Sequence, residues 1–422
     1  MDEEFTGSEV PDSLQPVHRR KTECDEGRAY SQSNDLQPNG SDPGKTLYVS
    51  VPKLGENEVI VPGSLALRFD INLSGGHANN YLVQNVSRAL VSRMKVKFGT
   101  TTFQDIDGYD IFKIYKDLFL SQEQRDNMLL DGIQSEDLCN IRSNAGDKKT
   151  SGVDAEKKLN EVCGTKYIIR LDNKILTDHG VFYPKALYSA LSFQLKLVPA
   201  VQVVKGSDPT KLKYKLTNIE LQYKMIRSEL LAREARSVYS SGKEFAYDHV
   251  QFDKSIEIEK GSDTKVNITL DAQRRLMKAI VLFFIEPHSA GARDSEKYVF
   301  PHLTKVLVRV NGKTNRLYDE GIVNTDSWEE ASQFFVREEN KTEHMNMKLF
   351  FARDRFGLVI DLHSMADRTM HGSGTRLVNS TDGVQLQLQR TATGSGKINC
   401  MVYVVSNAQL NILEYQLESV EY

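Results

Sequence analysis

The residues best suited to bind a metal ion lie near the C-terminal end of the chain. Asp367 and His371 follow His363 at spacings of four and eight residues, which could bring two imidazoles and a carboxylate to one ion. The same stretch contains Gly372-Ser-Gly374 and is expected to form a loop after a strand, where histidine side chains are usually solvated. We therefore predict no metal-ligating residue in this chain.

Other patterns typical of enzymes are weak. Asp178-His179-Gly180 resembles part of a hydrolase site by residue type alone, and the sequence has neither a Gly-X-Ser-X-Gly elbow nor a His-Glu-X-X-His motif. Gly372-Ser-Gly374-Thr375 and Gly394-Ser-Gly396-Lys397 have the composition of phosphate-binding loops, but no helix is expected after either to point its amides at an anion. We interpret both as turns, and predict no catalytic residue, no cofactor and no enzymatic activity.

One basic stretch could face a partner. In Lys211-Leu-Lys-Tyr-Lys215 the alternation places three lysines on the same face of a strand, and Lys224-Met-Ile-Arg227 follows in the same region. A solvated face opposite the core explains this pattern, and a surface that contacts another subunit or a genome is the alternative.

The composition excludes several classes of protein. The 54 Lys and Arg residues nearly balance the 57 Asp and Glu residues, so we predict no sequence-specific binding of nucleic acid. Cys24, Cys139, Cys163 and Cys400 show no paired spacing and are interpreted as free thiols in a reducing compartment. The first residues are acidic and polar, so no signal peptide is expected, and the longest apolar run, 279–285, is too short to span a bilayer.

Most of the secondary-structure elements that the sequence predicts are β-strands. The most regular pattern starts after Ser64 and predicts a strand with one buried face, a loop, a second strand that ends at Gly99, a short third strand and a helix capped by Asp107 or Asp110. The first strand is recognised by five apolar residues at period two: Leu65, Leu67, Phe69, Ile71 and Leu73.

A similar unit recurs in the second half of the chain. Val306, Val308 and Val310 alternate with polar residues, Asn311-Gly312 forms a turn, and a capping box at Asp326-Ser-Trp-Glu329 predicts the start of a helix. The run 279–285 is apolar at every position and is expected to be a central strand. Two β units of the same layout indicate an internal duplication.

The chain therefore divides into four parts. Residues 1–43 are polar and are expected to form a disordered tail, 44–226 a first β domain, 227–242 a connecting helix and 243–422 a second β domain. Within the strand predicted for 214–225 the apolar residues change parity once, which indicates a β-bulge or the meeting of two strands. Many short strands separated by Gly, Ser and Asn turns favour an all-β fold of sandwiches or jelly rolls.

Two passages resemble a known family. The run Asn85-Val-Ser-Arg-Ala-Leu-Val-Ser-Arg-Met-Lys-Val-Lys-Phe-Gly99, followed by a helix that contains tyrosine, resembles the first jelly roll of the double jelly-roll major capsid proteins. The run from Tyr298 to Gly312, in which Phe300-Pro301 leads into a strand ending in Asn-Gly, resembles the matching passage of their second jelly roll. Among these proteins the passages resemble those of the Polinton (Maverick) and adintovirus-like elements, and the resemblance extends from about Thr46 to the C-terminus.

This resemblance implies a structural protein of a virion. It predicts two tandem antiparallel jelly rolls of eight strands each, with short helices in the connections. Three chains would form a pseudo-hexameric capsomer and tile an icosahedral shell, with penton and minor capsid proteins as further partners and a contact between the N-terminal tail and inner capsid components. Assembly would take place in the cytoplasm or nucleus of a host cell. The alternative is a non-viral carbohydrate-binding or adhesion protein made of two β-sandwiches.

Overall fold

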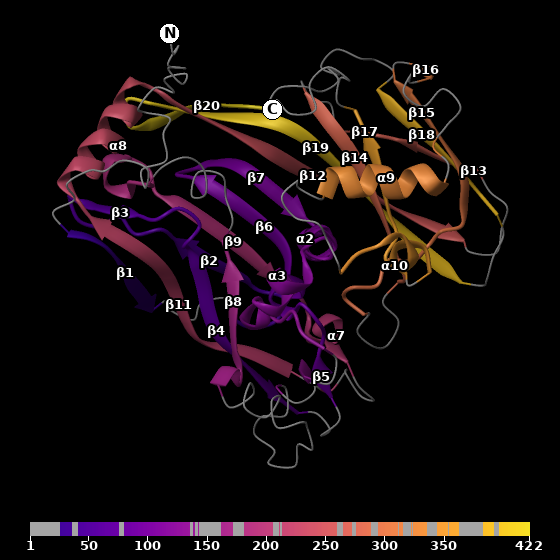
Figure 1. The fold of residues 1–422 in the computed structure, drawn as a ribbon, viewed down its shortest axis with the longest axis horizontal. Helices are drawn as coiled ribbons and strands as arrows, with labels where there is room; N and C mark the ends of the chain where they lie inside the picture. The colour runs from indigo at the N-terminus through magenta and orange to yellow at the C-terminus, as the bar shows by residue number, and fades with distance from the viewer. Residues whose placement is uncertain are drawn as a thin grey trace, which may run out of the picture.

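The computed structural model describes two β units joined by a helix (Figure 1). In Figure 1 most of the first unit, in indigo to pink, occupies the left and lower part of the molecule, and most of the second unit, in salmon to yellow, occupies the right, while its C-terminal strand β20 extends to the upper left beside α8. The described residues are 26–35, 41–75, 80–135, 138–139, 142, 162–171, 181–205, 211, 213–259, 265–271, 276–287, 294–310, 312–314, 322, 324–335, 344–352, 354–362, 383–391 and 396–422.

The first unit is a sandwich of two antiparallel sheets. One sheet has the order β1-β11-β4-β8, with the short strand β3 also paired to β11, and the other has the order β2-β9-β6-β7. The strands are β1 (Glu26–Asp35), β2 (Thr46–Ser50), β3 (Glu58–Ile60), β4 (Ala66–Ser74), β6 (Val91–Phe98), β7 (Thr101–Asp107), β8 (Lys166–Arg170), β9 (Leu191–Leu197) and β11 (Lys213–Arg227).

The second unit is built in the same way. Its sheets have the orders β12-β19-β14-β17 and β13-β18-β15-β16, and the C-terminal strand β20 pairs with the end of β19. The strands are β12 (Lys243–Glu259), β13 (Lys265–Thr269), β14 (Met277–Ile285), β15 (Leu303–Val310), β16 (Lys313–Thr314), β17 (Gly357–Asp361), β18 (Val384–Arg390), β19 (Lys397–Leu413) and β20 (Gln416–Glu421).

The two units share one topology. When the eight main strands of each unit are numbered along the chain, both units have the sheet orders 1-8-3-6 and 2-7-4-5. This arrangement of two four-stranded antiparallel sheets is a jelly roll. The turn between strands 4 and 5 contains a glycine at positive φ in both units, Gly99 at 61° and Gly312 at 73°. The predicted fold class, two tandem antiparallel jelly rolls, and the predicted duplication are therefore confirmed.

Short helices occupy the connections. Helix α8 (Glu229–Ser241) joins the units and is capped by Ser228, whose hydroxyl accepts a hydrogen bond from the amide of Leu231. The other helical elements and two further short strands are β5 (Tyr81–Leu82), α1 (Val86–Ala89), α2 (Tyr109–Asp117), α3 (Gln122–Asp126), η3 (Leu129–Asp131), η4 (Pro184–Ala186), α7 (Ala200–Val203), β10 (Val204–Lys205), α9 (Asn324–Phe335) and α10 (Met347–Ala352).

The start of the first jelly roll differs from the prediction. Glu26–Asp35, expected in a disordered tail that ends at residue 43, forms β1 and pairs with β11 from Glu26–Arg227 to Asp35–Glu220. Without β1 the first unit would lack strand 1 of the jelly roll, so this unit begins at Glu26. An edge strand needs no apolar period when backbone pairing holds it, so its sequence carried no signal. The rest of the predicted tail lies outside the described residues.

Local details of the helices also differ from the prediction. The N-cap of α2 is Gly108, in the left-handed conformation at φ 64°, because the turn from β7 requires that backbone shape, and neither Asp107 nor Asp110 caps the helix. Helix α9 already begins at Asn324, so Asp326 lies in its first turn and the predicted capping box is wrong.

The predicted change of parity in β11 is a β-bulge. The register between β11 and β4 shifts between Thr217 and Glu220, and Asn218 has φ 49°. Asparagine tolerates this left-handed conformation better than most residues. The bulge keeps Leu216 and Ile219, which have opposite parity in the sequence, both buried in the core.

Candidate functional site: the junction between the two jelly rolls

The side chains considered for catalysis and metal binding are not brought together in the described part of the chain. His363, Asp367, His371 and Asp178-His179-Gly180 lie outside the described residues, as does Gly372-Ser-Gly374-Thr375. Within the described ranges, no group of three or more His, Cys, Asp or Glu side chains could hold a metal ion. None of the described helices has the length and apolar character needed to cross a bilayer.

The two jelly rolls meet in an aromatic cluster around helix α2. Tyr115 of α2 is buried, and its ring centroid lies 4.5 Å from that of Phe283 in β14, 4.8 Å from that of Tyr298 and 5.2 Å from that of Phe335 in α9. Phe112 of the same helix lies 5.5 Å from Tyr403 in β19. A helix of the first unit therefore packs on the face of a second-unit sheet that carries Phe283 and Tyr403.

Two glycines make this close approach possible. A Cβ atom on Gly357, the first residue of β17, would lie 2.5 Å from the hydroxyl oxygen of Tyr115. A Cβ atom on Gly108 would collide with the hydroxyl of Tyr403. The backbone at each position therefore lies directly against a buried tyrosine of the other unit.

Buried tyrosine hydroxyls tie the units together through backbone carbonyls. Tyr298 of the second unit donates a hydrogen bond to the carbonyl of Ile111 at 2.7 Å, Tyr403 donates to the carbonyl of Gly108 at 2.9 Å, and Tyr247 donates to the carbonyl of Phe103 at 2.6 Å. Burial raises the pKa of Tyr115, and the nearby Tyr298 adds to this rise, so its phenol stays neutral. These bonds satisfy polar groups that the packing removes from water.

A buried ionic network lies beside the aromatic cluster. Arg125 of α3 contacts Glu296 of the second unit at 2.5 Å, and both side chains are less than a tenth exposed. Arg125 also donates to the carbonyl of Asp117 at 2.9 Å, and Arg355 lies 3.6 Å from the other oxygen of Glu296. One carboxylate therefore balances two guanidinium groups from different units.

His344 completes this network as a neutral side chain. Its Nε2 atom lies 2.6 Å from the guanidinium of Arg355, which donates, and its Nδ1 atom lies 3.2 Å from the amide oxygen of Gln122. This pattern requires the proton on Nδ1. Burial, and then the positive charges of Arg125 and Arg355, lower the pKa of His344 to about 3.

The passage that begins at Asn85 positions α2. Asn85 has a left-handed backbone, φ 49°, and its amide donates to the carboxylate of Asp117 at 2.9 Å. Arg88 donates to the hydroxyl of Tyr109 at 2.7 Å and lies 3.6 Å from Asp117. Both ends of α2 are thus fixed by α1 in the interior of the first unit, which holds the helix for its contact with the second.

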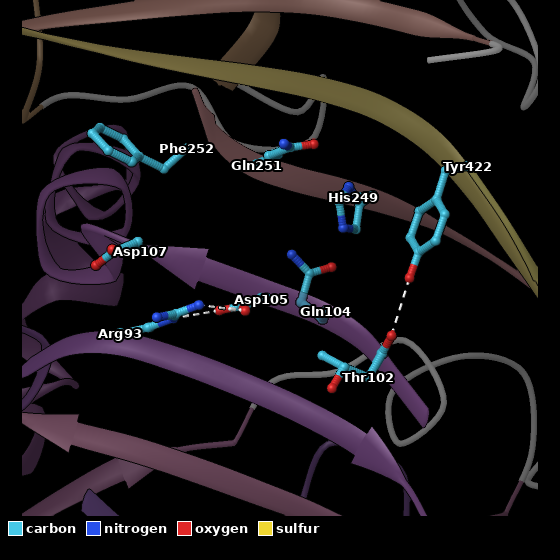
Figure 2. Close-up of a pocket in the computed structure, with 9 residues that line it drawn as sticks. All are labelled: Arg93, Thr102, Gln104, Asp105, Asp107, His249, Gln251, Phe252 and Tyr422. Carbon is cyan, nitrogen blue, oxygen red and sulfur yellow. Dashed lines mark hydrogen bonds and ion pairs between the residues drawn. The ribbon is translucent and has the colours of Figure 1, made fainter. Parts of the chain in front are cut away.

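A polar groove runs along the same junction between β7 and β12 (Figure 2). Arg93 binds Asp105 through two hydrogen bonds of 2.7 Å, and Tyr422 donates to the carbonyl of Thr102 at 3.1 Å. Burial alone would raise the pKa of Asp105, but hydrogen bonds from Arg93 and Lys95 hold it below its usual value. The other residues that line the groove are Gln104, Asp107, His249, Gln251 and Phe252.

Several polar side chains of this groove have partners within the protein. The carboxylate of Asp105 accepts from Arg93, and Gln104 donates to the carbonyl of Val250 at 3.1 Å. Gln104 therefore joins the two units, whereas the pair Arg93–Asp105 links β6 and β7 within the first unit. The groove, the aromatic cluster and the ionic network form one structural junction.

Sequence reasoning missed most of this junction. The helix at Tyr109–Asp117 was predicted from its period, but nothing in the sequence pairs Arg125 with Glu296 or places His344 beside them. Ser121 and Gln124 do form a capping box at the start of α3, a local pattern that the sequence carries. The basic residues Lys213 and Lys215 lie exposed on the outer face of β11, opposite the core.

Comparisons with known proteins support the fold. No family model and no curated protein matches the chain. Among solved structures, it is similar to PBCV-1 VP54 as fitted into a reconstruction of the virophage Sputnik (TM-score 0.63, 13% identity, covering 97% of this chain and 99% of that one).

Two further structures are similar over most of their length. The Faustovirus major capsid protein gives a TM-score of 0.53 at 8% identity, covering 92% of this chain and 90% of that one. The mavirus major capsid protein gives a TM-score of 0.50 at 11% identity, covering 98% and 95%. The chain therefore has the fold of the double jelly-roll major capsid proteins of viruses.

Proposed function

We propose that this protein is a structural major capsid protein whose chains trimerise into pseudo-hexameric capsomers and tile an icosahedral shell. The observation that carries the proposal is the repetition of one jelly-roll topology, 1-8-3-6 and 2-7-4-5, in two units held by a buried junction. The full-length similarity to viral major capsid proteins supports it.

The duplication is suited to a trimer. Two similar units in one chain give six similar units in three chains, and a head-to-tail contact that repeats around an axis closes into a ring. The junction in this structure is such a head-to-tail contact, because α2 of the first unit packs on β14 of the second.

The finer assignments follow from the resemblance. We place the protein in virions of a Polinton-like or adintovirus-like double-stranded DNA virus or element, with assembly in the cytoplasm or nucleus of the host. Its partners are other copies of itself, penton and minor capsid proteins, and inner capsid components that the N-terminal segment contacts. The near-neutral charge of the chain supports a shell protein without sequence-specific DNA binding.

Light scattering after size exclusion tests the proposal. The purified chain should give a mass three times the 47.7 kDa of one chain, and electron microscopy should show pseudo-hexagonal particles or shells. A stable monomer that binds a glycan would contradict the proposal and favour a carbohydrate-binding or adhesion protein.

A further inference from the structure

The outer faces of the two equivalent sheets are covered differently within the chain. In the second unit β14 is buried at nearly every position. One face of this strand lies in the core of the jelly roll, and α2 of the first unit and α9 pack on the opposite face. In the first unit the equivalent sheet β1-β11-β4-β8 alternates along β11 and β4 between buried residues and exposed or half-buried ones. Among the described residues this outer face is therefore less covered than that of β14, although α1 and η3 contact the edge strand β8.

The strand register shows which positions of the two sheets are equivalent. In the second unit Phe283 of β14 is paired with Gly357, the first residue of β17, and α2 packs at this pair. In the first unit the corresponding strands, β4 and β8, pair Asp70 with Lys166, the first residue of β8. Lys215 of β11 lies beside this pair, opposite Asn72.

This first-unit face is basic. Its outward side chains include Lys166, Lys213, Lys215 and Lys224, which are exposed, and Arg170, which pairs with Asp131 at 3.3 Å, against the half-buried acids Asp70 and Glu220. We call this surface, formed by the outward residues of β11, β4 and β8, the basic face. The equivalent surface in the second unit is aromatic, so a partner of the basic face must present charge where α2 presents aromatic rings.

The second unit has an acidic helix at the equivalent point of its chain order. Helix α9 follows strand 5 of its unit, as α2 follows strand 5 of the first unit. Asp326, Glu329 and Glu330 lie along α9, and Glu329 is exposed. By its position in the chain order, α9 is therefore the element of the second unit that corresponds to α2, and it presents the exposed Glu329.

We propose that the basic face is the site at which a second copy of this chain docks, with α9 of that copy lying over Lys166 and Lys215. The contact between chains then repeats the contact within the chain, with opposite charges in place of aromatic rings. This inference rests on the proposed function, since it names the surface through which the capsomer closes. Charge complementarity of this kind sets the partner and its register.

Charge reversal tests the docking site. The double substitution Lys166→Glu with Lys215→Glu should raise the concentration at which the trimer half-dissociates at least tenfold, measured by sedimentation velocity at physiological salt. A matched control, Lys185→Glu with Lys265→Glu, reverses two exposed lysines on η4 and β13 and should leave the trimer unchanged. Adding Glu329→Lys to the first variant should restore at least half of the lost association.

The outcomes separate this inference from the proposed function. If the native chain is a trimer that the Lys166 and Lys215 substitutions leave intact, the docking site is wrong and the capsid proposal stands. If the native chain is a monomer at all concentrations, the capsid proposal itself fails. Loss of binding to a double-stranded DNA fragment in the same variant, with the trimer unchanged, would assign the basic face to nucleic acid and overturn the inference. Circular dichroism checks that each variant is folded.

Discussion

Tyr115 of the first jelly roll and Gly357 of the second are in direct contact, with no space for a side chain between them. A Cβ atom at Gly357 would lie 2.5 Å from both the hydroxyl oxygen and the Cζ atom of Tyr115. The ring cannot move away easily, because Phe119, Phe283, Tyr298 and Phe335 surround it. The separation of the two units is therefore fixed at this pair.

Gly357→Ala should destabilise the protein by about 1–3 kcal/mol, because a methyl group overpacks a closed aromatic cluster. The measurement is the free energy of unfolding by chemical denaturation. Gly55→Ala is the control, since its new Cβ would meet mainly the flexible carboxylate of Glu58, and its effect should be smaller. Equal effects of the two substitutions would show that the cluster yields to the added methyl.

Truncation of Tyr115 tests the opposite change. Tyr115→Ala should cost about 3–5 kcal/mol, because it leaves a cavity between the two units. Tyr115→Phe should cost much less, because the hydroxyl makes only a long 3.4 Å contact with the carbonyl of Arg355. Thermal unfolding should also lose cooperativity in the alanine variant, and a single sharp transition with unchanged midpoint would contradict the role of the cluster.

The effects of substitutions at Arg125 and Glu296 on stability should be coupled. Arg125→Met alone should destabilise the protein by about 3–5 kcal/mol, because it leaves the carboxylate without its closest partner. Adding Glu296→Gln should recover part of this loss, since the remaining charge is removed as well. A double-mutant cycle measures the coupling, and additive effects would mean that the pair contributes nothing as a pair.

His344 should make the junction sensitive to acid. Its pKa is lowered to about 3 in the folded protein from its ordinary value near 6.5, so below pH 6.5 the unfolded chain binds a proton that the folded protein does not. The stabilisation is therefore complete above pH 6.5 and is lost as the pH falls toward 3.

The pH dependence can be assigned to this side chain. Between pH 7.5 and 5.5 the native protein should lose up to about 1 kcal/mol more of its unfolding free energy than His344→Gln, after allowance for solvent screening. Denaturation curves at the two pH values give the difference. Identical slopes in both proteins would exclude His344 as the source.

The sequence predicted the elements whose pattern is local. The apolar run 279–285 was expected to be central and is the heart of β14, because a strand covered on both faces needs apolar residues at every position. The bulge in β11 was visible as a change of parity, because the side-chain period of a strand is two residues. The helix after Gly99 was visible in its 3.6-residue period.

The features that could not be predicted from the sequence depend on contacts between distant residues. The polar strand β1 is held by backbone pairing with a strand nearly two hundred residues away, and polar side chains at an edge carry no pattern. The junction could not be predicted either, because no local period links Arg125 to Glu296 or Tyr115 to Gly357. The outcome for His363, Asp367 and His371 stays open, since they lie outside the described residues.

Helix α8 affects the rate at which the two jelly rolls pair, as well as their connection. Its 13 residues keep the two jelly rolls on one covalent chain, so the contact of Tyr115 with the second unit forms at a rate that does not depend on protein concentration. Dilution would separate the chains of the proposed capsomer but would leave this internal pairing intact. Half of the contacts in the proposed six-unit ring would then be formed before two chains meet.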